Sequence, residues 1–490
     1  MRRLVFLLAI LCHWAIGLCG QGNGDDEATV RLAPPQLAGT NDPIDFVLPP
    51  LVGAPAESPG ESPGEVVQTQ TWTVQSTPTS ENQSDARLDW LDDVQVGYDN
   101  GFVIASDHPI ELATEDSDYV LRINGWGQLR HTATDFRSGS SDLNQFQLKR
   151  GRLVFAGNAF EPELNYFVQL DGRSSSGDDV RLLDYYLDYD VGHAQWNRPR
   201  GALVLRAGKY KVPFSMARWM SGREFQFADR SLASTFFDVN RSFAWGVHGK
   251  LHPLGRPFHW DVAIFNGLVT GGAETGSSGN LDDNFAFSLR LHTFPTGDWG
   301  PTTLADLEHH DDLATRIGFG VATTRINRSG STEFTRLRVI DSGLRLSDLL
   351  PVDVNDYGVA LFATDVSTKF RGWSTTLEYY FRTIGNFSGS QSEDLFDHGL
   401  WLQIGKFVIP HRMELVTRWS HLTGDSGTLG RQNQSAEEIA AAMVWYLRQQ
   451  HCKWVTDVTY VDGAPIDSAA LDLAPGNAGW LFRSQVQFSF

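Results

Sequence analysis

The last eleven residues, Trp480-Leu481-Phe482-Arg483-Ser484-Gln485-Val486-Gln487-Phe488-Ser489-Phe490, alternate between two kinds of side chain. One face of an extended strand would carry Trp480, Phe482, Val486, Phe488 and Phe490, and the other Arg483, Gln485, Gln487 and Ser489. In a soluble protein, an apolar strand of this kind would be an exposed edge prone to aggregation. In a closed barrel it pairs with the first strand, so the pattern predicts a barrel.

The same alternation recurs from Tyr119 onward, between turns rich in Gly, Ser, Asp and Asn. Clear examples are residues 285–292, 313–321 and 412–419, where one face is apolar and the other is small or charged. Candidate strands begin near residues 121, 145, 163, 180, 202, 243, 258, 284, 313, 357, 371, 398, 411, 436, 452 and 479. This predicts an all-β chain over residues 119–490, a transmembrane antiparallel β-barrel of about 16 strands with a watery lumen.

Two features of the predicted strands are less regular. Residues 436–450 include Ala440-Ala441-Ala442 and have helical propensity, but we expect a strand there because an even strand count needs it. Aromatic residues near strand ends are expected in girdles at the membrane interfaces. These are Tyr185, Tyr186, Tyr189, Tyr379, Tyr380, Trp401, Trp419 and Trp445.

The N-terminal region predicts export. Residues 1–20 have two arginines followed by an apolar run, which is typical of a signal peptide cleaved near Gln21; a lipidated Cys19 is the weaker alternative. Residues 21–85 are rich in Pro, Ser and Gly and predict a disordered periplasmic extension, and residues 86–118 a periplasmic lead-in. Only Cys452 would remain in the mature chain, so no intrachain disulfide is expected. Together these features predict the bacterial outer membrane.

The segment Gly201–Ser242 opens as a strand and then loses its alternation. It carries Arg206, Lys209, Lys211, Arg218, Arg223, Arg230 and Arg241 against only Glu224, Asp229 and Asp238. The whole chain is acidic, with 40 Lys+Arg against 59 Asp+Glu and a formal net charge of −19. A local cationic excess in an acidic protein is a place where an anion could dwell. We therefore expect this segment to fold into the lumen as an anion-selecting constriction.

Strand alternation also places cations on the lumen face. These are Arg122, Arg130, Arg290, Arg316, Arg412, Arg418 and Arg483. The planar guanidinium of arginine can donate two parallel hydrogen bonds to two oxygens of one phosphate. The alternative is that these arginines pair with inward acids and stabilise a water-filled wall. Both interpretations stay open at this point.

Several blocks of sequence resemble one family in their order along the chain. They are residues 97–102, 121–125, 146–155 and 166–171, followed by 203–210 and the segment to Phe237. This order is similar to the phosphate-selective porins O and P. The resemblance spans about residues 95–490, is strongest over 119–265, and implies a trimer of sixteen-stranded barrels with an infolded third loop.

The resemblance also implies site residues. Arg223 and Arg230 match basic residues of the constriction loop, Lys149-Arg150 match a basic pair on the second strand, and Asp184 resembles the acidic residue of the constriction. Arg152 departs from the pattern, because the family typically has an aromatic residue there. The acidic run Glu308–Asp312 could repel anions at the mouth.

The expected function is passive, anion-selective diffusion across the outer membrane, with phosphate or polyphosphate as the substrate. The candidate anion-binding residues are Lys149, Arg150, Asp184, Arg218, Arg223, Arg230, Arg290, Arg316, Arg412 and Arg418. The expected partners are small anions, outer-membrane lipid and two further copies of the chain, with no nucleic acid. The alternatives are a general, weakly selective porin and a structural or tethering barrel.

We expect no enzyme and no cofactor, because the sequence has neither a Gly-x-Ser-x-Gly elbow nor a phosphate-binding P-loop. No metal site is expected either. The adjacent residues of Glu308–Asp312 are poor cage geometry, and a solvated charge run is the simpler interpretation.

Overall fold

The computed structural model describes residues 94–490, apart from 99–100, 107–116, 139, 174–178, 269–281, 303, 329–332, 341–342, 390–391 and 426–434. The predicted signal peptide and the predicted extension over 21–85 lie outside the described residues. Among the helices that are described, none is long and apolar enough to cross a membrane.

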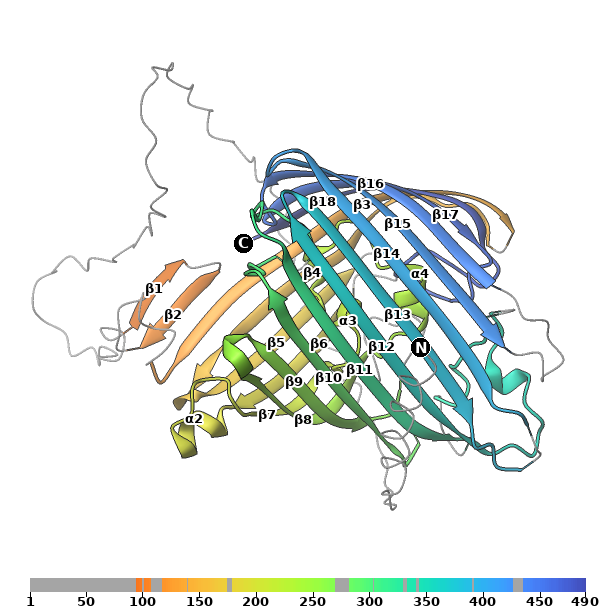
Figure 1. The fold of residues 1–490 in the computed structure, drawn as a ribbon, viewed down its shortest axis with the longest axis horizontal. Coiled ribbons are helices and arrows are strands. Elements are labelled where there is room, and N and C mark those ends of the chain that lie inside the picture. Colours follow the sequence, from red (N-terminus) through yellow and green to blue (C-terminus); the bar gives the residue numbers. More distant parts are fainter. Residues whose placement is uncertain are drawn as a thin grey trace, which may run out of the picture.

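Sixteen antiparallel strands, each paired with its neighbours along the chain, close into a barrel when β18 pairs with β3 (Figure 1). The first eight are β3 (Val120–Ser138), β4 (Asn144–Ala159), β5 (Glu161–Arg173), β6 (Asp179–Tyr189), β7 (Val204–Lys211), β8 (Arg241–Leu251), β9 (Phe258–Asn266) and β10 (Phe285–Thr296). The others are β11 (Ala314–Asn327), β12 (Asp356–Phe370), β13 (Trp373–Gly385), β14 (Leu395–Ile409), β15 (Met413–Asp425), β16 (Ser435–Arg448), β17 (Cys452–Asp462) and β18 (Ala478–Ser489). The predicted fold class is confirmed.

The short helices lie in the connections between strands. They are α2 (Val191–Trp196), α3 (Met216–Trp219), α4 (Leu232–Phe236) and the 3-10 turns η2 (Gly222–Glu224), η3 (Pro253–Gly255) and η4 (Leu346–Asp348). Figure 1 shows α3 and α4 within the ring of strands.

The barrel has apolar side chains outside and charged side chains inside. Phe146 is 84% exposed and Trp245 72%, whereas Arg130 and Arg483 are no more than 2% exposed. This inverts the pattern of a soluble protein and suits a wall with lipid on one side and a polar lumen on the other. The C-terminal strand follows the rule, with Trp480, Phe482 and Phe488 exposed and Arg483, Gln485 and Gln487 buried.

Residues 436–450 fall mainly in a strand, as expected, since β16 runs from Ser435 to Arg448. Its even-numbered residues face inward, where Ala436, Glu438 and Ala440 are buried, while Ile439 is exposed. Pairing with β15 and β17 on both sides overrides the helical propensity of the alanine run. The small alanines leave room inside the barrel for the infolded loop.

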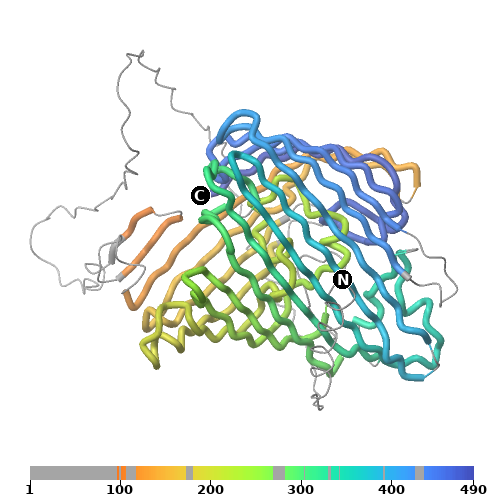
Figure 2. Tube along the Cα trace, viewed as in Figure 1, coloured from red at the N-terminus to blue at the C-terminus, as the bar shows by residue number. Residues whose placement is uncertain are grey.

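The chain closes beside a two-stranded hairpin of β1 (Val94–Tyr98) and β2 (Phe102–Ser106). β2 pairs with the first residues of β3, and β18 pairs with the rest of the same edge. Phe490 exchanges backbone hydrogen bonds with Gly125 between these two pairings, at 3.0 and 3.2 Å. Figure 2 shows the hairpin, in orange, beyond that end of the barrel.

The connection between β7 and β8, residues 212–240, follows the β3–β4 and β5–β6 connections as the third loop at the same end of the barrel. It folds into the lumen. We call it the infolded loop. Its apolar residues, including Phe214, Phe236 and Phe237, join a buried cluster with residues of the β11–β12 and β17–β18 loops, such as Phe334 and Leu471. The predicted infolded third loop is therefore confirmed, and it packs as a core within the barrel.

Candidate functional site

The infolded loop consists of three short helical turns, which explains why the alternation of the strands stops at Lys211. Each turn starts at a serine whose hydroxyl accepts a backbone N–H: Ser215 caps α3, Ser221 caps η2 and Ser231 caps α4. Such caps satisfy backbone donors that would otherwise be orphaned within the barrel.

Asp229 is the residue of the infolded loop that gathers most charge. Its carboxylate lies 2.5 Å from Arg130 on β3, 2.8 Å from Arg150 on β4 and 3.6 Å from Arg483 on β18. Burial alone would raise the pKa of Asp229, but these arginines hold it well below its usual range. The carboxylate is therefore ionised, and it ties the loop to three strands.

Carboxylates of the wall accept the backbone N–H groups of the loop. Glu378 on β13 accepts Met216 N–H at 2.7 Å and Ala217 N–H at 3.2 Å. Glu438 on β16 accepts Leu232 N–H at 2.7 Å, at the start of α4. Asp457 on β17 accepts Ala228 N–H at 2.9 Å. These acids face the lumen and hold the loop.

Cations of the wall donate to loop carbonyls in the same way. Arg290 on β10 donates to Phe214 O at 2.9 Å, and Arg418 on β15 donates to Asp229 O at the same distance. Gly320 on β11 lies against the same Phe214 carbonyl, because a Cβ at this position would be 2.0 Å from Phe214 O. The close approach of the loop to the wall thus requires glycine at this position.

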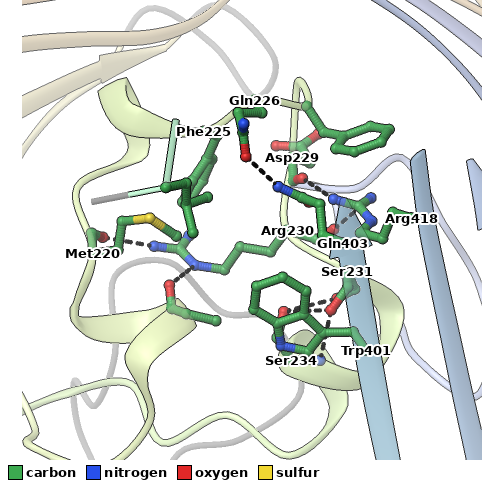
Figure 3. A pocket seen from close by; sticks show the side chains of 13 residues that line it. Met220, Phe225, Gln226, Asp229, Arg230, Ser231, Ser234, Trp401, Gln403 and Arg418 are labelled. Atoms are coloured by element: carbon green, nitrogen blue, oxygen red, sulfur yellow. Dashed lines mark hydrogen bonds between the residues drawn. The ribbon is translucent and has the colours of Figure 1, made fainter. Parts of the chain in front are cut away.

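Arg230 follows Asp229 and reaches across a cavity of about 20 Å³ between the loop and the wall. Its guanidinium donates to Ala217 O at 2.9 Å and to Met220 O at 3.4 Å, and it lies over the Phe225 ring. Figure 3 shows Arg230 extending toward Met220, with Arg418 and Asp229 on the other side. Trp401 and Gln403 on β14 complete the wall side of this cavity.

A second cavity, of about 10 Å³, adjoins the first and shares Asp229 and Arg230 with it. Arg150 and Arg218 line it, together with Ser468 and Leu471 of the β17–β18 loop. We call these two spaces the arginine cavities. Each has room for about one water molecule.

Four of the predicted site residues meet at the arginine cavities: Arg150, Arg218, Arg230 and Arg418. Arg218 forms an ion pair of 2.9 Å with Asp238. Burial raises the pKa of Asp238, although Arg218 and other nearby cations oppose the shift. Around these cavities the lining carries four arginines and one aspartate.

Four other predicted residues lie in wall contacts. Lys149 pairs with Asp472 of the β17–β18 loop at 2.7 Å, and Asp184 pairs with Arg241 at 2.7 Å. Arg290 and Arg316 both face Asp365 on β12, at 2.6 and 3.8 Å.

The last two predicted residues are not in the arginine cavities. Arg223 lies in η2 with an exposed side chain, and its carbonyl accepts a hydrogen bond from Gln487. The expected position of Arg412 on the lumen face is wrong. It lies in the turn before β15 and is exposed, because the strand begins only at Met413.

The sequence did not single out the acids that hold the loop, although Glu438 and Asp457 lie on the lumen face by simple alternation. Trp401 and Tyr380 were expected in an interfacial girdle, but they are buried inside at 3% and 0% exposure. Counting alternation from the exposed Leu377 would have placed Tyr380 inside. Arg152, the departure from the family pattern, pairs with Asp171 at 3.0 Å and lies over the Trp126 ring.

The acidic run Glu308–Asp312 lies in the β10–β11 connection, at the opposite end of the barrel from the infolded loop's own connection. Asp306, Glu308 and His310 come close to one another there. Asp306 accepts from Gly372 N–H and His310, and Glu308 accepts from Thr302. These internal hydrogen bonds account for the cluster.

Comparison with known proteins finds one family model, phosphate-selective porin O and P, which matches residues 127–297. Similar solved structures include an anion-selective porin from Comamonas acidovorans, with 10% identity, 76% of this chain and 99% of that chain covered, and a TM-score of 0.49. Another is OmpT, an outer membrane protein of Vibrio cholerae, with 10% identity, 76% and 98% covered, and a TM-score of 0.46.

A third is the outer membrane channel DcaP of Acinetobacter baumannii, with 11% identity, 76% and 97% covered, and a TM-score of 0.46. A comparison with curated proteins finds no match. The predicted resemblance to the phosphate-selective porins is confirmed over residues 127–297. This match and the closed barrel support an outer-membrane porin, and they point to a channel rather than an enzyme.

Proposed function

We propose that the protein conducts small anions passively across the outer membrane and selects them at the arginine cavities, with phosphate or polyphosphate as the preferred substrate. The observation that carries this proposal is the meeting of Arg150, Arg218, Arg230 and Arg418 at two adjoining cavities that share Arg230. Arg150, Arg218 and Arg418 already pair with Asp229, Asp238 and Glu438. The proposal therefore depends most on Arg230, which donates to backbone carbonyls.

The mechanism is an exchange of hydrogen-bond acceptors at Arg230. Its guanidinium donates to the neutral carbonyls of Ala217 and Met220, and a phosphate oxygen is a stronger acceptor for a charged donor. Since the cavities hold about one water each, an anion passes only when the Arg230 side chain moves. Arg150 and Arg418 flank the path and replace part of the anion's hydration.

The ion pairs of the wall favour a second candidate, a general and weakly selective porin. Asp184–Arg241, Arg290–Asp365 and Arg382–Asp397 are buried pairs in which each cation already faces an acid. Such pairs stabilise a polar wall without needing a transported anion. Under this candidate Arg150, Arg218 and Arg418 also serve as wall-stabilising partners, of Asp229, Asp238 and Glu438.

The resemblance over residues 127–297 supports two further parts of the proposal, the preference for phosphate and assembly as a homotrimer in the outer-membrane lipid. Removal of residues 1–20 as a signal peptide fits the same location. The alternative of a tethering role concerns residues 21–85, which lie outside the described residues.

The test is the reversal potential of the purified protein in a planar bilayer under a potassium chloride gradient. Wild type should favour chloride, and Arg230→Glu should lose most of that preference because it reverses the charge at the shared residue of both cavities. Arg256→Glu, at an exposed arginine of the β8–β9 turn, is the matched control and should retain the selectivity. Equal selectivity in wild type and Arg230→Glu would support the general porin instead.

A further inference from the structure

A third cavity, of about 180 Å³, lies between the infolded loop, β10, β11 and the β10–β11 connection. The loop contributes Met216, Trp219 and Met220, and the wall and connection contribute His292, Phe294, Trp299, Pro301, Thr302 and Arg316. We call it the aromatic cavity. Met220 lines both it and the first arginine cavity, so the two spaces are neighbours across one side chain.

Aromatic rings form a continuous row along one side of the aromatic cavity. The His259 ring stacks on His292 with 4.5 Å between centroids, and the Phe294 ring lies 5.7 Å from His292 and 6.0 Å from Trp299. Trp299 is held in place because its carbonyl accepts Lys369 Nζ at 2.9 Å. The wall therefore presents a fixed aromatic surface to a ligand in this cavity.

Two buried polar groups at this cavity make no hydrogen bond to any described residue. Arg316 is 5% exposed, and the oxygen of Asp365 nearest to its Nη1 is 3.8 Å away. The closer contact of Asp365, at 2.6 Å, goes to Arg290. His292 Nδ1 is likewise buried without a partner. Buried polar groups are nearly always paired. The Nη1 donor of Arg316 lies 3.8 Å from an oxygen of Asp365 that also has no hydrogen-bond partner, which leaves the guanidinium available to a closer acceptor at this cavity.

We propose that the aromatic cavity binds a small organic anion with a single aromatic ring, of the aromatic monocarboxylate class. Its carboxylate accepts hydrogen bonds from Arg316, which suits the planar fork of a guanidinium. Its ring packs among Trp219, Phe294 and Trp299, where aromatic contacts add to the apolar burial. The proposal extends the function above from small inorganic anions to a class of organic substrate.

The size of the cavity agrees with one ring. An apolar cavity of roughly 150 Å³ accommodates benzene, whereas drug-sized ligands occupy about 300 Å³ or more. The charges nearby do not oppose an anion strongly. Asp365 lies between Arg290 and Arg316, and Glu378 is engaged by amides of the loop. Glu308, which accepts from the hydroxyl of the lining residue Thr302, faces Lys369 Nζ at 3.6 Å.

This inference rests on the proposed function in one respect, because a ligand reaches the aromatic cavity through the lumen. Binding is measured by isothermal titration calorimetry on the full-length protein folded in detergent, with benzoate as the probe. Benzyl alcohol supplies the ring without the charge, and acetate supplies the charge without the ring. Benzoate should bind with one site per chain, and both controls should bind at least about tenfold more weakly.

Variants assign the binding to the aromatic cavity. Arg316→Gln should weaken benzoate binding by about tenfold or more, and Arg316→Lys by less, since it keeps the charge but loses the fork. Trp219→Leu, on the half-buried side of the loop, should weaken benzoate but leave acetate unchanged. Arg382→Gln, which breaks a buried pair with Asp397 elsewhere in the wall, is the matched control for loss of an inward arginine. Thermal unfolding of each variant confirms that the barrel is intact.

The results separate this inference from the proposed function. Equal affinity for benzoate and acetate, or benzoate binding unchanged in Arg316→Gln, would overturn the aromatic site even if phosphate still blocks the channel. Benzoate binding that depends on Arg316 in a protein without anion selectivity would keep the aromatic site and overturn selection at the arginine cavities. If Arg382→Gln weakens benzoate binding as much as Arg316→Gln does, the loss is not specific to the aromatic cavity, and the result would overturn the site.

Discussion

Asp229 and Arg130 form an ion pair of 2.5 Å in the barrel interior, although they are 99 residues apart in the chain. Arg130 belongs to the first barrel strand and Asp229 to the infolded loop. Arg150 on β4 and Arg483 on β18 approach the same carboxylate from the barrel strands on either side of β3. The seam where the barrel closes is therefore also the anchor of the loop that narrows the lumen.

Asp229→Asn should release this anchor. The substitution leaves three buried arginines without their shared anion, and removing one partner of a buried ion pair costs about 3–5 kcal/mol. We expect lower stability in thermal or denaturant unfolding and a larger single-channel conductance, because the loop loses the tie to the three strands at the barrel seam. Asp188→Asn, which removes a wall pair with Arg206, is the control and should not enlarge the channel.

The same carboxylate predicts how the anchor responds to acid. The pKa of Asp229 is lower when folded than in the unfolded chain, so its stabilisation is present above the ordinary pKa and is lost only as the pH falls through the lowered value. Conductance should therefore stay constant from neutral pH down to about pH 4. An increase in conductance already at pH 5 would contradict this anchoring role.

Gly320→Ala tests the contact between the loop and β11. A Cβ at this position would lie 2.0 Å from Phe214 O, so the loop backbone must move away from the wall. We expect a loss of about 1–3 kcal/mol in the free energy of unfolding. Gly358→Ala on β12 is the matched control, since its nearest neighbour, Gly385 O, would be 3.5 Å away. Equal stability of the two variants would show that the infolded loop does not pack closely against β11 at Gly320.

Glu333, in the β11–β12 loop, should make the contact with Leu268 depend on pH. Burial, together with the nearby Asp282, raises the pKa of Glu333 to about 8, although Leu268 N–H and Arg336 oppose the shift. Because the folded pKa is raised, the stabilisation is fully present below the ordinary pKa of the group and is lost as pH rises through about 8. Amide exchange of Leu268, corrected for the intrinsic pH dependence, should therefore speed up as the pH rises toward about 8 and should level off above it.

Glu333→Gln is the matched variant for this prediction. An amide cannot ionise, so the corrected exchange of Leu268 should no longer change with pH across this range. If the wild-type protein shows the same flat profile, Glu333 does not control the contact between the two loops.

The strands were predictable because the environment of the barrel repeats every two residues. Lipid lies on one side of each strand and a polar lumen on the other, so the faces of 285–292 and 313–321 can be assigned from sequence alone. The same regularity overrides local propensity, which is why residues 435–448 form a strand despite their alanines. The third loop was recognisable because its alternation stops and its cations cluster.

The details of the site were less accessible. Alternation gives the face of a side chain but not the end of a strand, so Arg412 was assigned to the lumen although it belongs to a turn. Asp229 was counted among the loop's few acids, but its role depends on the path of the loop to Arg130, which no local pattern encodes. Trp401 was assigned to the membrane interface because aromatic residues are common both there and in a core.

The central claim is that Arg230 binds the transported anion, and phosphate block of the chloride current tests it most directly. Single-channel current of the purified protein is recorded in a planar bilayer while phosphate is titrated in. The account predicts block of wild type and of Arg382→Gln at the same phosphate concentration. In Arg230→Gln, the loss of a charge-assisted hydrogen bond should raise that concentration by about tenfold or more. Block that is absent in wild type, or that is equally strong in Arg230→Gln, would contradict the claim.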